Sequence, residues 1–185
     1  MKERPSDEID GLPPALSELP WSDEFVMQAI EILPVAAVEG DGVVAWRPEH
    51  ADSFIVGWPA GARPEEVAHT ALQRLGLEPV VLHSTSWRHG DGEVILTYLA
   101  VVDAIAPPQS WTSVAVARAD LARGDALAPP PVIGVQQVLE HGLRHLAWLL
   151  REDEAVQRAL GGWAARLRGY EPEPFRSFGP GPATG

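Results

Sequence analysis

The segment Pro59–Leu77 (PAGARPEEVAHTALQRLGL) constrains the fold more than any other part of the chain. Pro64 suits the first position of a helix, and the two glutamates after it lie where the helix dipole favours negative charge. The next apolar residues recur at helical spacing and form one stripe: Val67, Ala68, Ala71, Leu72 and Leu75. Gly76 then ends the helix, because glycine readily adopts the left-handed conformation of a C-terminal cap. The segment predicts a loop followed by an amphipathic helix that packs on a core.

The composition indicates one soluble domain, since 45% of the 185 residues are apolar. The absence of cysteine excludes disulfides and thiolate zinc sites. A net charge of −12 argues against binding to nucleic acid or anionic membrane, because both depend on lysine and arginine. No apolar run approaches the roughly 20 residues that span a bilayer, and the charged N-terminus lacks a signal peptide's apolar segment. We therefore expect a cytoplasmic protein, and the excess of arginine over lysine suggests a GC-rich, bacterial genome.

The two ends of the chain are rich in proline and predict a flexible acidic arm over 1–20 and a loose tail over 171–185. The domain between them is expected over 21–170. At its start, Ser22 is a good helix N-cap, and acidic residues follow it. The apolar residues after this cap fit a helix that Pro34 stops: Phe25, Val26, Ile30 and Leu33. We expect an N-terminal helix over about 22–33.

A hairpin is expected next, because the apolar runs Val35–Val38 and Val43–Trp46 flank the turn Glu39-Gly40-Asp41-Gly42. Glycine tolerates the positive φ that a tight turn requires. The other strand candidates are Ser53–Trp58, Glu78–Arg88, Glu93–Asp103 and Trp111–Arg118. Strands that alternate with helices in this way predict an α/β fold.

Helices dominate the C-terminal part. After a linker at Ala128–Pro131, the longest helix candidate is Ile133–Arg151, and its apolar side either packs on the domain or forms a homodimer surface. Shorter helical pieces are expected at Asp120–Arg123, Glu154–Leu160 and Trp163–Leu167.

The order of these elements resembles the α/β/α sandwich of the Nudix family, over about Val35 to Leu150. Trp46-Arg47 resembles a family strand that often ends in arginine. Gly57–Gly61 (GWPAG) resembles the W-x-P-G-G entry to the Nudix box, and Pro64–Ala68 (PEEVA) resembles the start of the box helix. The resemblance implies a Nudix-like sandwich with a mixed sheet, extended by the N-terminal helix and the C-terminal helices.

The catalytic residues of the Nudix box are missing. In the family pattern, G-x5-E-x7-R-E-U-x-E-E-x-G-U with U apolar, the helix glutamates hold divalent cations that act on a diphosphate. Counting back from Gly76-Leu77, the R-E-U-x-E-E positions hold His69, Thr70, Ala71, Leu72, Gln73 and Arg74. Mg²⁺ prefers carboxylate oxygens, and arginine repels it. We predict a pseudoenzyme with a degenerate box and no cofactor, which keeps the packing of the helix and lacks its cation site.

Other residues are weaker candidates for chemistry. Glu65 and Glu66 are the remaining acids of the helix, although first-turn acids ordinarily complement the dipole. Asp103 or Asp120 is a further candidate acid. His141 and His145 form an H-x3-H pair that suits zinc or copper, but no third ligand is visible nearby, and helix packing is the favoured interpretation of the pair.

The resemblance also implies a ligand site on the sheet face beside the box helix. The residues expected there are Arg47, Trp58, Trp87, Arg88 and Tyr98. Arginine pairs with phosphate and tryptophan stacks on a base, whereas the alternative is aromatic packing at the rim of the sheet with solvated arginines.

Two functions remain open from the sequence. The first is a non-hydrolytic module that binds a small molecule, such as a nucleotide, or a protein partner. The second is a divergent hydrolase of nucleoside-diphosphate-linked compounds, which uses relocated carboxylates and depends on Mg²⁺ or Mn²⁺.

Overall fold

The computed structural model describes residues 27–90, 93–121 and 133–171. The elements in chain order are β1 (Met27–Ala37), β2 (Val43–Pro48), β3 (Phe54–Gly57), α1 (Pro64–Arg74), β4 (Pro79–Gly90), β5 (Glu93–Val102), β6 (Trp111–Ala115), α2 (Val135–Glu152) and α3 (Glu154–Ala159). A short 3-10 turn, Gly161–Trp163, follows the last helix. The arm expected over 1–20, the linker at 128–131 and the tail over 172–185 lie outside the described residues.

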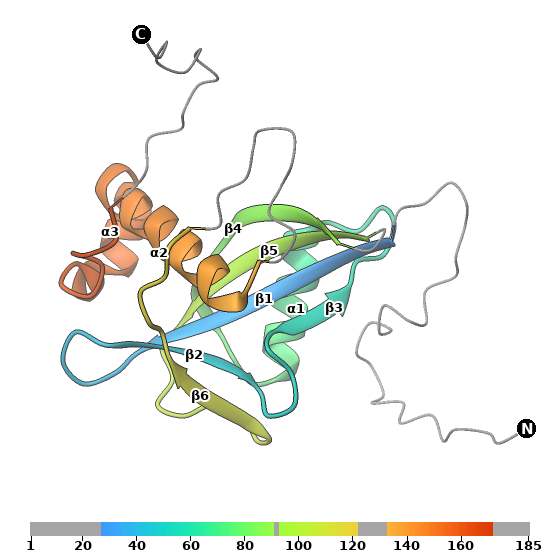
Figure 1. The fold of residues 1–185 in the computed structure, drawn as a ribbon, viewed down its shortest axis with the longest axis horizontal. Coiled ribbons are helices and arrows are strands. Elements are labelled where there is room, and N and C mark those ends of the chain that lie inside the picture. The colour runs from blue at the N-terminus through green and yellow to red at the C-terminus, as the bar shows by residue number, and fades with distance from the viewer. Residues whose placement is uncertain (1–26, 91–92, 122–132, 172–185) are drawn as a thin grey trace, which may run out of the picture.

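The strands form one mixed sheet in the order β4-β5-β1-β2-β6, and β3 pairs with a separate stretch of β1 (Figure 1). β1 runs parallel to β5, with Met27 opposite Glu93 and Val35 opposite Val101. The other pairs are antiparallel. β1 therefore lies at the centre of the sheet and pairs with three strands.

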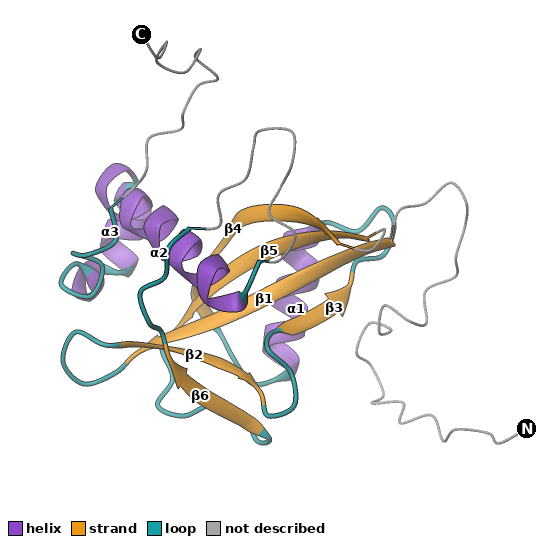
Figure 2. Cartoon of the chain, viewed as in Figure 1, coloured by secondary structure: helices purple, strands orange, loops and turns teal. Residues whose placement is uncertain are grey.

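Helices cover both faces of the sheet, with α2 in front of β1 and α1 behind it in the view of Figure 2. On the α1 face, the helix packs on a core that includes Ile30 and Ile32. On the α2 face, α2 and the C-terminal turns pack on a core that includes Leu33 and Val35. The protein is an α/β/α sandwich with a mixed sheet, as the sequence predicts.

The prediction of an N-terminal helix over about 22–33 is wrong in the part that the structure describes, because Met27–Ala37 forms β1. The residues from Ala29 to Leu33 are almost completely buried. A central strand is covered on both faces, so its apolar residues run on without alternating, and a short run of this kind cannot be told from a helix by pattern. Pro34 lies between the stretch of β1 that pairs with β3 and the stretch that pairs with β2, where its missing N–H interrupts neither ladder.

The hairpin between β1 and β2 is confirmed. Gly40 has φ +73° in its turn, and the backbone N–H of Val38 donates to Gly42 O at 3.2 Å. The strand expected over Trp111–Arg118 is confirmed as far as Ala115.

Two short helical predictions differ from the structure. Asp120 and Leu121 are not helical, and the backbone carbonyl of Asp120 instead accepts from Gln137 Nε2 at 3.4 Å. Trp163–Leu167 continues the 3-10 turn as a series of turns rather than a helix. There, Arg166 Nη2 donates to Val38 O at 3.0 Å and attaches this region to the first hairpin.

The predicted helix α1 is confirmed, and Gly76 ends it with φ +71°. Ala68, Ala71 and Leu72 are completely buried against the sheet. Full burial of one leucine side chain contributes about 2 kcal/mol, so the stripe anchors the helix. The other side of α1 is left to face solvent.

Helix α2 is also confirmed and approaches the sheet closely at Gly142. A Cβ at this position would lie 3.4 Å from Leu99 Cδ1 and 3.6 Å from Thr85 Cγ2, so a larger side chain has little room. No described helix is long and apolar enough to cross a membrane.

Candidate functional site

The exposed side of α1 carries the polar side chains of His69, Thr70, Gln73 and Arg74, and its acids are confined to the first turn. One carboxylate approaches from beyond the helix. Glu78 Oε1 lies 3.2 Å from His69 Nε2, and Glu78 Oε2 accepts from Gln73 Nε2 at 3.4 Å. The side chains of His69 and Glu78 are 40% and 71% exposed. A single solvated carboxylate beside an imidazole and an amide does not provide the oxygen cage that Mg²⁺ or Ca²⁺ requires.

The first-turn glutamates of α1 face the same way but are paired with Arg63. Its guanidinium bonds Glu65 and lies 3.4 Å from Glu66 Oε1. Glu66 also lines a shallow groove of about 220 Å³ that runs along the helix past Thr70 to Arg74. Within the described ranges, no three histidine or acidic side chains are grouped so that they could hold a metal ion.

The candidate acids Asp103 and Asp120 lie in connecting segments and not on α1. Both are exposed, Asp103 just after β5 and Asp120 in the segment after β6.

The aromatic candidates belong to the α1 face. Trp58 packs on the α1-side core and donates from Nε1 to Ala62 O at 2.8 Å, which fixes the loop before α1. Tyr98 is 6% exposed in the same core, and burial, aided by the charge of Glu65, raises the pKa of its hydroxyl. Trp87 on β4 is 65% exposed.

Arg88 lies on the α2 face and is used by the fold. Its Nη1 and Nη2 donate to Glu31 Oε2 and Oε1 at 2.6 and 2.9 Å, and Thr97 Oγ1 donates to Glu31 Oε2 at 2.9 Å. Burial alone would raise the pKa of Glu31, but the hydrogen bonds and charge of Arg88 outweigh it and hold that pKa below its ordinary value. Arg88 and Tyr98, predicted together, therefore lie on opposite faces of the sheet.

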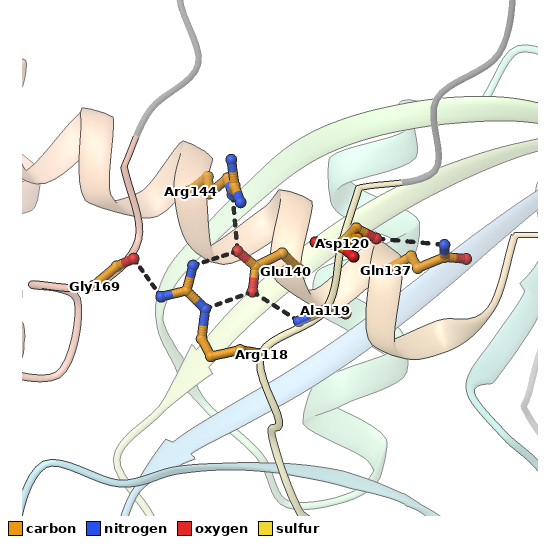
Figure 3. Close-up of polar contacts among 7 residues, drawn as sticks. All are labelled: Arg118, Ala119, Asp120, Gln137, Glu140, Arg144 and Gly169. Atoms are coloured by element: carbon orange, nitrogen blue, oxygen red, sulfur yellow. Dashed lines mark hydrogen bonds and ion pairs between the residues drawn. The ribbon is translucent and has the colours of Figure 1, made fainter.

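Glu140 carries a second buried carboxylate on the α2 face (Figure 3). Its structural role is not among the sequence predictions. Arg118 Nε and Nη2 donate to its two oxygens at 2.9 and 2.8 Å, and Arg144 Nε donates at 2.8 Å. Arg118 also donates to Gly169 O and lies over the ring of Tyr170. Burial would raise the pKa of Glu140, but the two arginines hold it low. The spacing of Glu140 and Arg144 signals one of these pairs; Arg118 is too distant in sequence to signal the other.

The two candidate metal histidines lie between α2 and β4. The His141 and His145 rings have centroids 4.6 Å apart, and the His83 ring of β4 lies 6.1 Å from His145. His141 Nε2 lies 3.3 Å from Thr85 O. Burial, then the neighbouring His141 and His83, lowers the pKa of His145 to about 4. His145 is therefore neutral at neutral pH, in keeping with a packing role.

Arg47 borders the more enclosed of two cavities, of about 210 Å³, between β2, β6 and the start of α2. The cavity has apolar walls formed by Leu33, Ala45, Val114, Val135 and Leu139. Its polar lining comes from Arg47, Asp52 and Gln136. Arg47 Nη1 donates to Asp52 Oδ1 at 2.5 Å and to Ala51 O at 3.3 Å. An apolar interior with a few polar groups is the usual form of a small-molecule site.

Comparisons with known proteins add little to this geometry. No family model matches the sequence, and no curated protein matches it. Among solved structures, the chain is similar to a protein from Chromobacterium violaceum named as a "putative nudix hydrolase family member", with 14% identity and a TM-score of 0.41. The match covers 76% of this chain and 92% of that chain. At this score it assigns neither a family nor an activity.

Proposed function

We propose that this protein is a Nudix-like domain that binds a small ligand and does not hydrolyse diphosphates. The surface of α1 carries the proposal, because Thr70, Gln73 and Arg74 stand at the positions where a Nudix box has its cation-binding carboxylates, and His69 stands at its arginine position. A metal-assisted reaction at this helix needs oxygen ligands, and the charge of Arg74 opposes a cation. The stripe that packs α1 on the sheet is intact, which supports a scaffold kept for recognition.

The buried carboxylates do not supply a replacement. Glu31 is bonded by both Nη atoms of Arg88, and Glu140 is bonded by Arg118 and Arg144. Moving Glu31 to a cation would leave the guanidinium of Arg88, 22% exposed, without its partner, at a cost of about 3–5 kcal/mol. Moving Glu140 would leave Arg144, 18% exposed, without the carboxylate that it bonds. We therefore assign both to the stability of the α2 face.

The ligand site in this proposal is the cavity beside Arg47. Its lining combines apolar walls with a guanidinium, a carboxylate and an amide, which together can fix the orientation of a bound molecule. The groove along α1 is shallower and is bordered by first-turn acids that Arg63 already pairs.

The proposal is tested by thermal shift with a panel of nucleotides and small metabolites, each with and without Mg²⁺. We expect at least one compound to raise Tm equally in both conditions, because binding needs no cation. The native chain should release no nucleoside monophosphate from diphosphate-linked compounds with Mg²⁺ or Mn²⁺. Metal-dependent turnover would overturn the proposal, and no stabilisation by any compound would favour a protein partner, including a second copy detectable by light scattering.

A matched variant tests the reason for the missing cation site. Thr70→Glu, Gln73→Glu and Arg74→Glu combined restore three acids to the exposed side of α1. We expect this variant to bind Mn²⁺, measured by electron paramagnetic resonance, where the native chain does not. Equal Mn²⁺ binding by both proteins would show that the surface of α1 is not what prevents it.

One observation favours the alternative of a divergent hydrolase: Glu78 lies beside His69 and Gln73. This alternative predicts turnover that Glu78→Gln abolishes, together with Glu66→Gln in the adjacent groove or Glu65→Gln. Absence of turnover over a broad diphosphate panel with either metal removes the alternative.

A further inference from the structure

We infer that the cavity beside Arg47 takes the apolar part of a small molecule, of about the size of one aromatic ring or a short branched chain. This inference rests on the proposed binding function and adds the chemical class of the ligand. It depends on three properties of the cavity: its aliphatic walls, its size, and polar lining groups that are already paired within the protein.

The walls of the cavity are largely aliphatic and come from both the sheet and the helix α2. Leu33 on β1 and Leu139 on α2 are 4% and 1% exposed and belong to the α2-side core. The other aliphatic wall residues are Ala45 on β2, Val114 on β6 and Val135 at the start of α2. A polar group placed against such a wall loses its contacts with water and gains no hydrogen bond in return. The walls therefore favour hydrocarbon.

The size of the cavity fits one ring. Its volume is about 210 Å³, which lies between the roughly 150 Å³ of an apolar cavity that takes up benzene and the roughly 300 Å³ at which pockets for drug-sized ligands begin. A whole nucleoside diphosphate is therefore too large to be enclosed, and its phosphates would meet aliphatic walls. The enclosed part of the ligand is a single ring or a branched chain, and any larger part stays outside.

The polar groups of the lining are already paired. Arg47 Nη1 donates to Asp52 Oδ1 and to Ala51 O, and Arg47 Nε is buried, so it does not face the cavity. The side chain of Asp52 is 87% exposed and extends into solvent. Gln136 Oε1 accepts from the backbone N–H of Ala117 at 3.4 Å. The charge of Arg47 is thus neutralised at the border of the cavity, and the aliphatic walls decide which groups enter.

The probes are p-xylene and hydroquinone, which have the same ring and differ in two methyl and two hydroxyl groups. Because these groups lie at opposite ends of the ring, at least one hydroxyl of hydroquinone must face an aliphatic wall. Titration of the full chain with p-xylene, followed by magnetic resonance, should shift the methyl signals of Leu33, Val114 and Val135. Hydroquinone should bind about tenfold more weakly, because a buried hydroxyl without a partner loses its hydrogen bonds to water. AMP should not displace p-xylene.

Three variants locate the effect. Val135→Thr places a hydroxyl in the wall and should narrow the preference for p-xylene over hydroquinone. Val114→Phe should fill the cavity and abolish the binding of both probes; thermal denaturation shows whether this variant folds, and Val135→Thr decides the test if it does not. The matched control is Val67→Thr, which makes the same change in the groove along α1 and should leave both affinities unchanged.

The outcomes separate this inference from the function beneath it. Equal affinity for the two probes, or binding of p-xylene that leaves the methyl signals of the cavity walls unmoved, overturns the ligand class. If p-xylene does not bind and another compound raises Tm, the inference is overturned and the binding function stands. If no compound binds, both are overturned. Metal-dependent hydrolysis overturns the proposed function whatever p-xylene does.

Discussion

The two faces of the sheet place their carboxylates in opposite environments. On the α1 face the core is apolar, and acids such as Glu65 lie outside it, half exposed and paired with Arg63. On the α2 face Glu31 and Glu140 are buried at 2% and 0% exposure, and arginines neutralise both. Each face holds its helix, but only the α2 face builds ion pairs into the packing.

This difference explains why neither face offers a cation site among the residues that the structure describes. A divalent cation needs several carboxylates that are close together and not otherwise paired. The α1 face has exposed acids that do not converge, and the α2 face has buried acids that arginines already occupy. The proposed ligand site lies on the α2 face beside Arg47, whose side chain is 33% exposed and pairs with Asp52. We therefore expect the removal of an acid to change the free energy of unfolding differently on the two faces.

The largest effect is expected from Glu31→Ala on the α2 face. The substitution leaves the guanidinium of Arg88, 22% exposed, without its bidentate partner. Removing one partner of a buried pair costs about 3–5 kcal/mol, so the free energy of unfolding should fall by about that amount. Denaturant titration measures it.

Glu65→Ala is the matched control on the α1 face. Its side chain is 56% exposed, and exposed ion pairs contribute about 0–1 kcal/mol. If both substitutions changed stability equally, the contrast between the faces would be wrong. The double variant Glu31→Leu with Arg88→Met sharpens the test, because removal of both charges should recover much of the loss.

The residues that make this contrast show what the sequence could and could not predict. The hairpin between β1 and β2 and the helices α1 and α2 were predictable, because turn glycines and the spacing of apolar residues are local signals. The pairing of Glu31 on β1 with Arg88 on β4 joins positions 57 apart, and it exists only because both strands flank β5 in the sheet. Arg47 is a predicted ligand-binding residue, but the cavity beside it could not be predicted. The start of α2 forms one wall of this cavity, and only the tertiary fold brings that helix to β2. The prediction for the segment that forms β1 was wrong, because burial on both faces removes the alternation of apolar and polar residues that marks a strand.

A smaller effect is expected from pH, again on the α2 face. The pKa of His145 is lowered to about 4 by burial and then by His141 and His83. Below about pH 6.5 the unfolded chain takes up a proton at His145 that the folded chain does not. The free energy of unfolding therefore falls as pH is lowered from about 6.5 to 4, and the contribution of His145 is fully present above pH 6.5. The loss should be roughly 1–2 kcal/mol, reduced by solvent screening because the side chain is only half buried.

His145→Gln tests this origin of the pH dependence. Its stability should change less than that of the native chain between pH 6.5 and 5, measured by denaturant titration at each pH. His50→Gln, an exposed histidine in the β2–β3 loop, should keep the native slope. An unchanged slope in His145→Gln would show that His145 is not the source of the acid sensitivity between pH 6.5 and 5. Glu31 and Glu140 act in a lower pH range, because their pKa values are lowered from 4.5 and their contribution is lost only as pH falls below that value.

An effect of the same order as that of pH is expected on the α1 face, and it depends on backbone conformation rather than charge. Gly76 has φ +71°, and no atom lies within 4 Å of a Cβ built on it, so Gly76→Ala meets no steric contact and only the cost of the left-handed conformation. That cost is about 1–2 kcal/mol for an alanine. Gly76→Asn should lose less, because asparagine tolerates this region, and both variants should have the native pH dependence. A loss from Gly76→Ala as large as that from Glu31→Ala would show that α1 is attached less firmly than its buried stripe indicates, and the two faces would then differ in strength as well as in charge.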